Sequence, residues 1–280
     1  MSRVANNHKR YNWKLFGVLY AAALFGVVCL IPYMLDMLLK LPDIARLLAT
    51  FDNPRSGARG VPPLVTILIL QFLQMAVILM PAVGLGVLLA NKIGCGALLV
   101  ESWLAGEKST ARNWAVLRSS IATGAGVGLV LLLLLVFVFI PLVPPLRAIL
   151  AADAALWKKF LAAFYGGITE EVLLRLFLFS LVAWLLGLIS RAPDRLPSAG
   201  AMWLANVLAA IVFGLAHLPS ATMSGAPITP LLVFAVLTLN GIASLTFGYL
   251  YWKRGLEAAM IAHFVTDVVL YVFGTLLVRA

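Results

Sequence analysis

Long apolar runs alternate with short polar segments along most of this chain. The runs cover about residues 15–39, 63–90, 121–143, 168–190, 201–218, 231–252 and 256–278. A helix needs roughly 20 apolar residues to cross the hydrocarbon core of a bilayer, and several of these runs reach or exceed that length. The pattern therefore predicts an all-α fold, a polytopic bundle of transmembrane helices.

An eighth membrane-embedded or interfacial element is expected in 91–118 or 146–166. The segment "LRAILAADAALWKKFLAAFYGG" is amphipathic and contains Lys158 and Lys159. Such a composition suits a helix that lies at the membrane surface. The prediction is thus seven or eight membrane helices.

The composition indicates a membrane protein, and it affects how the net positive charge is interpreted. The chain is 63% hydrophobic and 11% charged, whereas soluble domains average about 45–50% apolar and about 25% charged residues. The net charge of +10 does not indicate nucleic-acid binding, because the basic residues form no stripe with interleaved aromatics. The lipid bilayer is the expected partner, and nucleic acid is not.

The distribution of basic residues predicts a cytoplasmic N-terminus. Lysine and arginine gather on the cytoplasmic side of membrane helices. With seven spans, the basic loops 92–118, 191–195 and 253–254 all lie inside, as do the basic residues that precede the first apolar run, Arg3, Lys9, Arg10 and Lys14. The loop 40–62 opposes this orientation with Lys40, Arg46, Arg55 and Arg59.

Ionisable residues interrupt three of the last four apolar runs. They are Glu170, Glu171, Arg175, His217, His263 and Asp267. A charge exposed to lipid is costly, so intramembrane ionisable residues usually face a partner or a water-filled cavity and mark a function. We expect the C-terminal helices to enclose these residues in a conical cavity.

Helical spacing indicates which of these side chains meet. Glu171 and Arg175 are four residues apart and share a face, so they can form an ion pair. The adjacent Glu170 points about 100° away, into the expected cavity. His263 and Asp267 repeat the four-residue spacing, so the carboxylate can orient the imidazole.

Each feature also has a simpler interpretation. The pair of Glu171 and Arg175 is compatible with a purely structural ion pair, and His217 with an interfacial residue. His263 and Asp267 suit a proton relay in a transporter. The six residues together, on three helices, favour a functional site.

Three short motifs in order resemble a known family. They are "EEVLLR" (170–175), "FGLAH" (213–217) and "HFVTD" (263–267). The order and spacing are similar to EExxxR, FxxxH and HxxxN-or-D of the CPBP intramembrane proteases, which comprise the type II CAAX prenyl endopeptidases and the bacteriocin-processing or immunity (Abi) proteins. The resemblance divides the chain into N-terminal helices without a recognised motif, 1–145, and a CPBP-like catalytic core, 146–280.

The resemblance implies peptide-bond hydrolysis by an activated water. Glu170 would be the general base, and His217 would help to hold the water. Glu171, held by Arg175, would support the base.

The resemblance also implies roles for the two residues of the last motif, and it is compatible with a mechanism with or without a metal ion. His263 and Asp267 would stabilise the oxyanion or orient the substrate. An ionised Asp267 cannot donate a hydrogen bond as asparagine does, so His263 would donate while Asp267 fixes its tautomer. A zinc site of Glu170, His217 and His263 is the alternative to a metal-free mechanism, because two histidines and a carboxylate suit catalytic zinc.

The implied partner is a membrane-embedded or lipid-anchored peptide or protein substrate. A prenylated tail is the family archetype. The composition, rich in alanine and leucine, resembles that of bacterial proteins and favours a bacteriocin, a peptide pheromone or a membrane-protein segment, with the protein in the bacterial inner membrane. The alternatives are a proton-coupled transporter and a non-catalytic immunity protein.

Overall fold

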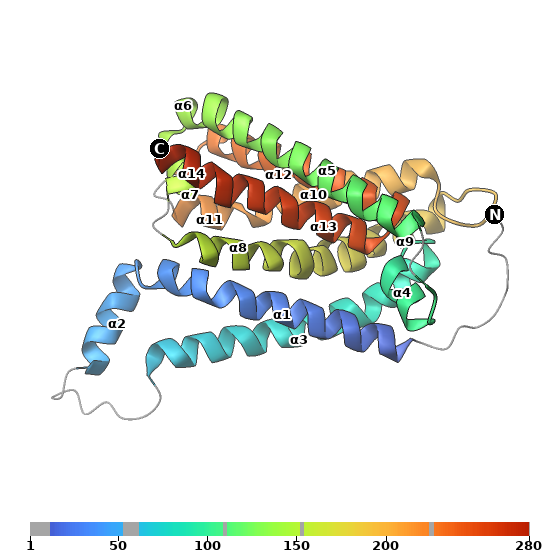
Figure 1. Cartoon of the computed structure of the whole chain (residues 1–280), viewed down its shortest axis with the longest axis horizontal. Helices are drawn as coiled ribbons and strands as arrows, with labels where there is room; N and C mark the ends of the chain where they lie inside the picture. Colours follow the sequence, from blue (N-terminus) through green and yellow to red (C-terminus); the bar gives the residue numbers. More distant parts are fainter. Residues whose placement is uncertain (1–11, 53–61, 109–110, 152–153, 224–226, 280) are drawn as a thin grey trace.

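The computed structural model describes residues 12–52, 62–108, 111–151, 154–223 and 227–279, and these residues form a helical bundle (Figure 1). The N-terminal basic residues Arg3, Lys9 and Arg10, together with Arg55 and Arg59, lie outside the described residues. The α-helices are α1 (Trp13–Leu38), α2 (Pro42–Asp52), α3 (Pro63–Lys92), α4 (Leu98–Leu104), α5 (Ala111–Leu134), α6 (Ile140–Leu142), α7 (Arg147–Ala151), α8 (Leu156–Phe164), α9 (Ser180–Ile189), α10 (Ala199–Ala216), α11 (Leu218–Met223), α12 (Pro230–Arg254), α13 (Leu256–Asp267) and α14 (Gly274–Arg279). The π-helical segments are η2 (Leu135–Phe139), η4 (Tyr165–Glu170), η5 (Val172–Phe179) and η6 (Val268–Phe273), and η3 (Pro144–Leu146) is a 3₁₀ turn.

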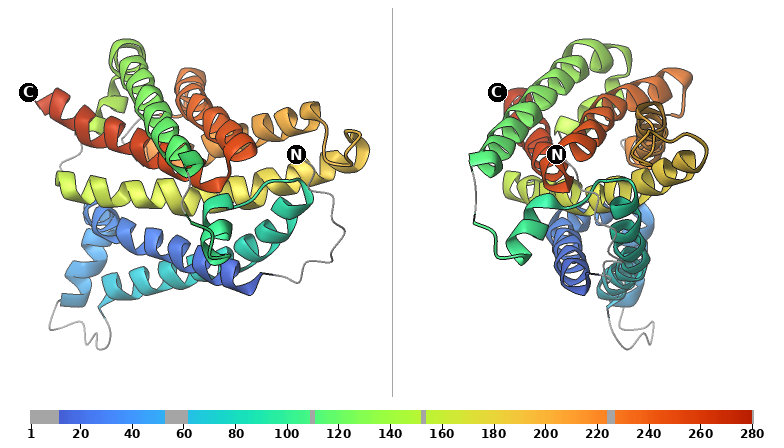
Figure 2. Two further views of the ribbon diagram at one scale, coloured as in Figure 1. Left: turned by 45° about the vertical axis from the view of Figure 1, so that its right-hand side comes forward. Right: turned by 90° about the vertical axis from the view of Figure 1, so that its right-hand side faces the viewer.

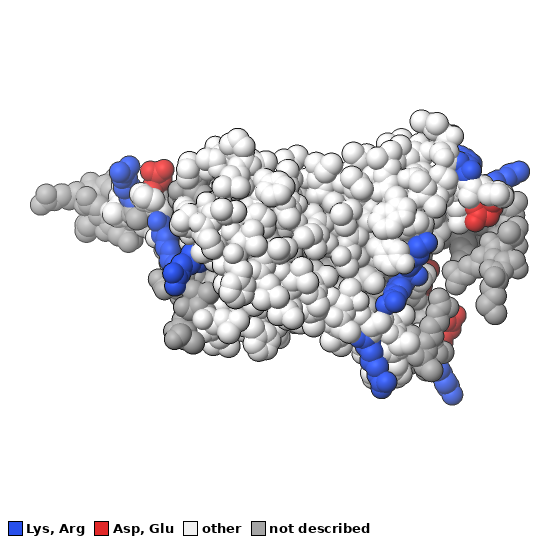
Figure 3. Space-filling view, turned by 90° about the horizontal axis from the view of Figure 1, so that it is seen from above, with Lys and Arg blue, Asp and Glu red and all other residues white. Residues whose placement is uncertain are grey.

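Seven helices among the described residues are long and apolar enough to cross a membrane. They are Trp13–Leu38, Pro63–Lys92, Asn113–Leu142, Leu156–Ile189, Ala199–Thr222, Pro230–Arg254 and Leu256–Leu277. Much of their outer surface consists of exposed leucine, isoleucine, valine and phenylalanine side chains. In the view of Figure 3 the middle of the molecule is free of charged side chains, which lie toward the two ends. The predicted polytopic membrane bundle is confirmed.

The fourth span is longer than the sequence pattern indicated. It begins at Leu156 instead of near residue 168, because α8 continues through η4 and η5 into α9. Most of the segment 146–166, one of the two places expected for an eighth membrane-embedded or interfacial element, is therefore part of the fourth span, and η3 and the short α7 precede it. The ammonium groups of Lys158 and Lys159 have partners inside the protein and do not have to reach the headgroup region. Lys158 Nζ pairs with Asp36 Oδ1 at 2.6 Å, and Lys159 Nζ donates to Leu150 O at 3.1 Å and Thr275 Oγ1 at 2.7 Å.

This long fourth span is the centre of the bundle. Figures 1 and 2 show α1 and α3 on one side of it and α5, α12 and α13 on the other. Helix α1 packs on α8 and η4, α3 on η5, and α13 on η4. Helices from both halves of the chain therefore surround the segment that contains the two glutamates.

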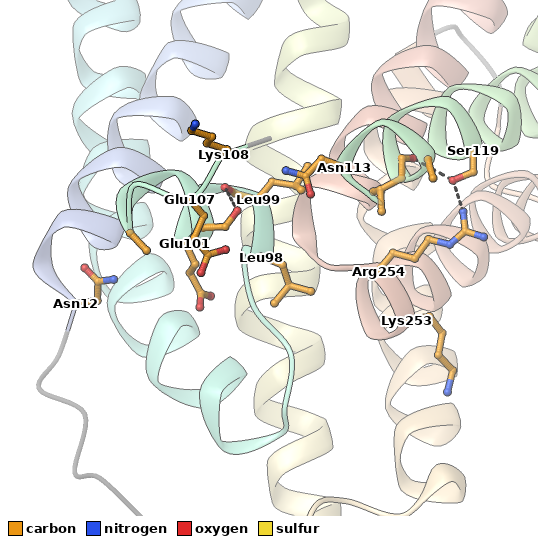
Figure 4. A pocket seen from close by; sticks show the side chains of 14 residues that line it. Asn12, Leu98, Leu99, Glu101, Glu107, Lys108, Asn113, Ser119, Lys253 and Arg254 are labelled. Atoms are coloured by element: carbon orange, nitrogen blue, oxygen red, sulfur yellow. Dashed lines mark hydrogen bonds between the residues drawn. The ribbon is translucent and has the colours of Figure 1, made fainter. Parts of the chain in front are cut away.

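Two of the loops predicted to be cytoplasmic, 92–118 and 253–254, meet at one end of the bundle. A cavity of about 870 Å³ at this end is lined by residues from the N-terminus of α1, from α4 and the residues after it, from α5 and from the C-terminus of α12 (Figure 4). Lys108, Lys253 and Arg254 are among its basic residues. Arg254 Nη1 donates to Ser119 Oγ at 2.5 Å across this end. The prediction that these basic loops share one side of the membrane is consistent with this arrangement.

The close packing of α3 against η5 depends on Gly86. A Cβ atom at this position would lie 2.8 Å from Leu176 Cγ and 2.9 Å from Leu176 O. We therefore expect Gly86→Ala to lower the free energy of unfolding by about 1–3 kcal/mol, as overpacking of a core does. Thermal unfolding in detergent measures the effect.

Gly17→Ala is the matched control, because nothing lies within 4 Å of a Cβ atom there. Alanine has the higher helix propensity, so this variant should be as stable as the wild type or more stable. Equal stability of the two variants would contradict the close packing of α3 on η5.

Candidate active site

Glu170 and Glu171 lie where two π-helical segments meet. Glu170 is the last residue of η4, and Glu171 separates it from η5. π-Helical turns are wider than α-helical turns and are frequent at functional sites. The sequence pattern predicted helical spacing here but not the widened turns. The span also places Glu170 well inside the helix, 14 residues after Leu156, which is deeper than the segment end expected from the sequence.

Glu171 connects the first motif to the third. Its Oε2 atom lies 3.2 Å from Arg175 Nε, and its Oε1 atom lies 2.8 Å from His263 Nδ1. The side chains of Glu171 and Arg175 have no exposed surface. The ion pair predicted from the four-residue spacing is confirmed, and its carboxylate also holds the histidine.

The contact with Glu171 fixes the tautomer of His263. A carboxylate only accepts hydrogen bonds, so the proton of this bond is on Nδ1. The sequence interpretation gave this role to Asp267, and that prediction is wrong. Asp267 Oδ2 lies near the other ring nitrogen, 3.7 Å from Nε2. The i,i+4 spacing does bring Asp267 to the ring, but to its opposite edge.

Glu170 faces the same nitrogen as Asp267. Its Oε2 atom lies 3.8 Å from His263 Nε2. Of the three carboxylate side chains, Glu170 is the most exposed, at 20%, compared with 15% for Asp267 and 0% for Glu171. The carboxylates of Glu170 and Asp267 thus both face Nε2. A proton on this nitrogen, or on one of the two carboxyl groups, lets a hydrogen bond form between them.

Two residues outside the motifs shape this cluster. Phe247 of α12 stacks on the His263 ring, with centroids 4.6 Å apart and planes at 22°. Gly166 lies so close that a Cβ atom would overlap Asp267 Oδ2 and lie 3.1 Å from His263 Nε2. The glycine pair at 166–167 was a signal in the sequence for close backbone approach. Phe247 was one aromatic residue among many and gave no signal.

His217 lies beside the cluster and contacts it through Phe213. Its Nδ1 atom donates to Phe213 O at 2.8 Å, and the two rings are 4.4 Å apart. The Phe213 ring also lies 5.8 Å from the His263 ring and 5.7 Å from Arg175 Cζ. The structure therefore brings Glu170, Glu171, Arg175, His263 and Asp267 into direct contact and places His217 one aromatic ring away.

The proposed zinc ligands do not form a ligand set in this arrangement. Within the described parts of the chain, no group of three or more His, Cys, Asp or Glu side chains is positioned to hold a metal ion. Glu170 and His263 approach each other, but the ring of His217 contacts Phe213. We therefore assign no step to a metal.

The cavity in Figure 4 is separate from this cluster, because none of the six ionisable residues lines it. A second cavity, of about 440 Å³, lies at the opposite end beside Asp36 and Lys158. The conical cavity expected around the six residues remains a prediction.

The buried pair of Glu171 and Arg175 supplies a test of stability. Removing one partner of a buried ion pair leaves an uncompensated charge and costs about 3–5 kcal/mol. We expect Glu171→Gln to lower the free energy of unfolding by about this amount, measured by denaturant titration in mixed micelles.

The control is the double variant Glu171→Gln with Arg175→Met, which removes both charges. The double variant should be more stable than the single Glu171→Gln variant, because two partners in contact do not contribute additively. Additive losses would show that the two side chains do not interact.

A comparison with known proteins matches the part of the chain that contains the three motifs. Residues 152–269 match the family model described as type II CAAX prenyl endopeptidase Rce1-like. No curated protein and no solved structure matches the chain. The matched segment contains all six ionisable residues of the three motifs. The predicted resemblance to the CPBP intramembrane proteases, at the level of the family and over residues 152–269, is confirmed.

Proposed function

We propose that the chain is an intramembrane endopeptidase that hydrolyses a peptide bond with a water activated by Glu170. The observation that carries the proposal is the cluster of three carboxylates, His263 and Arg175 inside an apolar bundle. Desolvated charges at this depth are expensive, and the same segment matches a peptidase family. A purely structural ion pair needs two of these residues, not five.

Glu170 suits the role of general base better than its neighbour. Both oxygens of Glu171 are engaged, one by Arg175 and one by His263. Glu170 is partly exposed and has an oxygen near His263 Nε2, where a water can contact both. In the proposed step the water oxygen attacks the peptide carbonyl carbon while Glu170 takes a proton, which later passes to the leaving amine nitrogen.

His263 suits the stabilisation of the tetrahedral intermediate. Its Nδ1–H group donates a hydrogen bond to Glu171. If Nε2 is also to donate a hydrogen bond, it must carry a proton as well, and the ring is then an imidazolium. Glu170, Glu171 and Asp267 surround this ring and compensate its charge. A preset donor aimed at a developing oxyanion is worth about 3–4 kcal/mol of barrier in known hydrolases.

The substrate we propose is a membrane-embedded or lipid-anchored peptide or protein. The cluster lies within apolar helices, so the scissile segment must enter the bilayer to reach it. His217, next to Phe213 at the end of α10, is placed to contact that segment or the water that it brings.

A cleavage assay tests the catalytic role. Purified protein in liposomes is offered a library of fluorogenic membrane peptides, and products are identified by mass spectrometry. We expect Glu170→Gln to lower kcat at least 100-fold, in the range of about 10²–10⁴ for a lost general base. Glu107→Gln, which changes an exposed glutamate at the distant cavity, should keep wild-type kcat.

Three results would contradict the proposed function or the proposed metal-free mechanism. Wild-type turnover in Glu170→Gln would exclude this residue as the base. Loss of cleavage on chelation with recovery on adding zinc would show that a metal takes part. Proton flux abolished by Glu170→Gln in a protein that cuts no peptide would indicate the transporter.

We also propose that the N-terminus is cytoplasmic and that the protein resides in the bacterial inner membrane. Single cysteines at two exposed lysines test this orientation. A membrane-impermeant maleimide added to intact spheroplasts should label Lys40→Cys and leave Lys108→Cys unlabelled until the cells are opened. The reverse pattern would invert the topology.

The native cysteines should not interfere with this labelling. Cys29 and Cys95 are both buried, and burial raises the pKa of the Cys95 thiol to about 12. The thiolate is the reactive species, so Cys95 stays protonated at neutral pH. The wild type is the unlabelled control.

A further inference from the structure

Two threonines each stand directly before a carboxylate of the motifs. Thr169 directly precedes Glu170, and Thr266 directly precedes Asp267. Both side chains are buried, and each hydroxyl donates to a backbone carbonyl on a helix from the N-terminal half of the chain. Thr169 Oγ1 donates to Ala23 O of α1 at 2.8 Å, and Thr266 Oγ1 donates to Gly124 O of α5 at 3.0 Å.

From these contacts we propose that Thr169 and Thr266 are positioning residues, through which α1 and α5 hold Glu170 and Asp267 in place. The inference rests on the proposed peptidase function. It also gives a role to α1 and α5, which lie in the part of the chain without a recognised motif.

A threonine that is bonded to a neighbouring helix fixes the direction in which the next residue on its own helix points. Adjacent residues point about 100° apart on an α-helix such as α13, and a smaller but equally fixed angle apart on the wider turns of a π-helical segment such as η4. A threonine bonded outward to a neighbouring helix therefore sets the rotation of the residue that follows it. For Thr169 and Thr266, the following carboxylates both point toward His263 Nε2.

Glycines on α1 and α5 allow the helices to come this close. A Cβ atom at Gly26 would overlap Thr169 Oγ1, and one at Gly124 would overlap Ala262 O. At Gly128 it would lie 3.0 Å from Thr266 O. Small residues let membrane helices approach closely. Gly26 and Gly128 contact the threonines that precede Glu170 and Asp267, and Gly124 contacts the residue that precedes His263.

The carbonyl oxygens of Ala23 and Gly124 can each accept a second hydrogen bond. Each carbonyl oxygen has two lone pairs, so Ala23 and Gly124 accept from threonine without giving up a bond of their own helices. In a bilayer a hydroxyl without a protein partner has no water to replace it. The hydroxyl groups are therefore held in these bonds, and the backbone segments with them.

Removing the hydroxyl while keeping the shape tests the proposal. Thr169→Val and Thr266→Val remove the donor, whereas Thr169→Ser and Thr266→Ser retain it. We expect each valine variant to lower kcat about 10- to 100-fold with KM changed less than twofold, because a small misplacement of catalytic groups costs up to about 100-fold. The serine variants should recover kcat to within threefold.

Two kinds of control separate positioning from general damage. Thr246→Val removes a hydroxyl that donates to Ile242 O within its own helix, and it should keep wild-type kcat. Gly26→Ala and Gly124→Ala should lower kcat as the valine variants do. Gly17→Ala and Gly126→Ala, on the same two helices with nothing within 4 Å of the added carbon, should not.

A spectroscopic measurement makes the test independent of proteolysis. The chain has three histidines, so ¹⁵N-histidine labelling of the full-length protein gives a spectrum simple enough to follow His263 Nδ1 and Nε2. Glu171→Gln assigns the signals. We expect both signals to shift in the valine variants, which displace the carboxylates around the ring, and to stay in place in the serine and Thr246→Val variants.

The outcomes are distinguishable from those of the proposed function. Unshifted His263 signals in both valine variants would overturn the inference, whether or not the protein cuts peptides. Equal loss of kcat in the valine and serine variants would also overturn it, because packing and not the hydroxyl would then be responsible. A protein that fails to cleave but shows the shifts would retain the positioning role and lose the peptidase function.

Discussion

The carboxylate of Glu171 is the contact on which the arrangement of this site depends. One oxygen holds Arg175 four residues further along the same helix, and the other holds His263, which is 92 residues away in sequence. Both partners are buried, so removing this carboxylate leaves a buried cation and an imidazole without its acceptor. The orientation of His263 Nε2 toward Glu170 and Asp267 follows from this contact.

The bundle is built so that this contact can exist in lipid. The fourth span passes through its centre, and helices from both halves of the chain cover it. Phe213 and Phe247 close the space around the histidine and arginine with aromatic rings, while Gly166 leaves room for Asp267. Polar groups are thus enclosed by protein, and the surface that faces lipid is apolar.

The sequence predicted what depends on local pattern and on motif order. Apolar length located seven spans, and the four-residue spacing predicted the pair of Glu171 and Arg175. The start of the fourth span was missed because Lys158 and Lys159 find their partners in Asp36 and Thr275, 122 and 116 residues away. The residue that bonds Nδ1 of His263 was misassigned for the same reason, because Glu171 is 92 residues away in sequence. Contacts between distant helices have no periodic signature in a single sequence.

The carbonyl groups of Ala23 and Gly124 have a consequence for how this fold can be divided. They belong to α1 and α5, which lie outside the segment that matches the peptidase family, yet they accept the hydroxyls beside two of its carboxylates. The motif-bearing segment therefore shares two buried hydrogen bonds with helices outside it. A chain that exchanged its first helices for others of equal hydrophobicity would still insert into a membrane. Side chains larger than glycine at positions 26 and 124 would, however, keep these carbonyls away from the two hydroxyls.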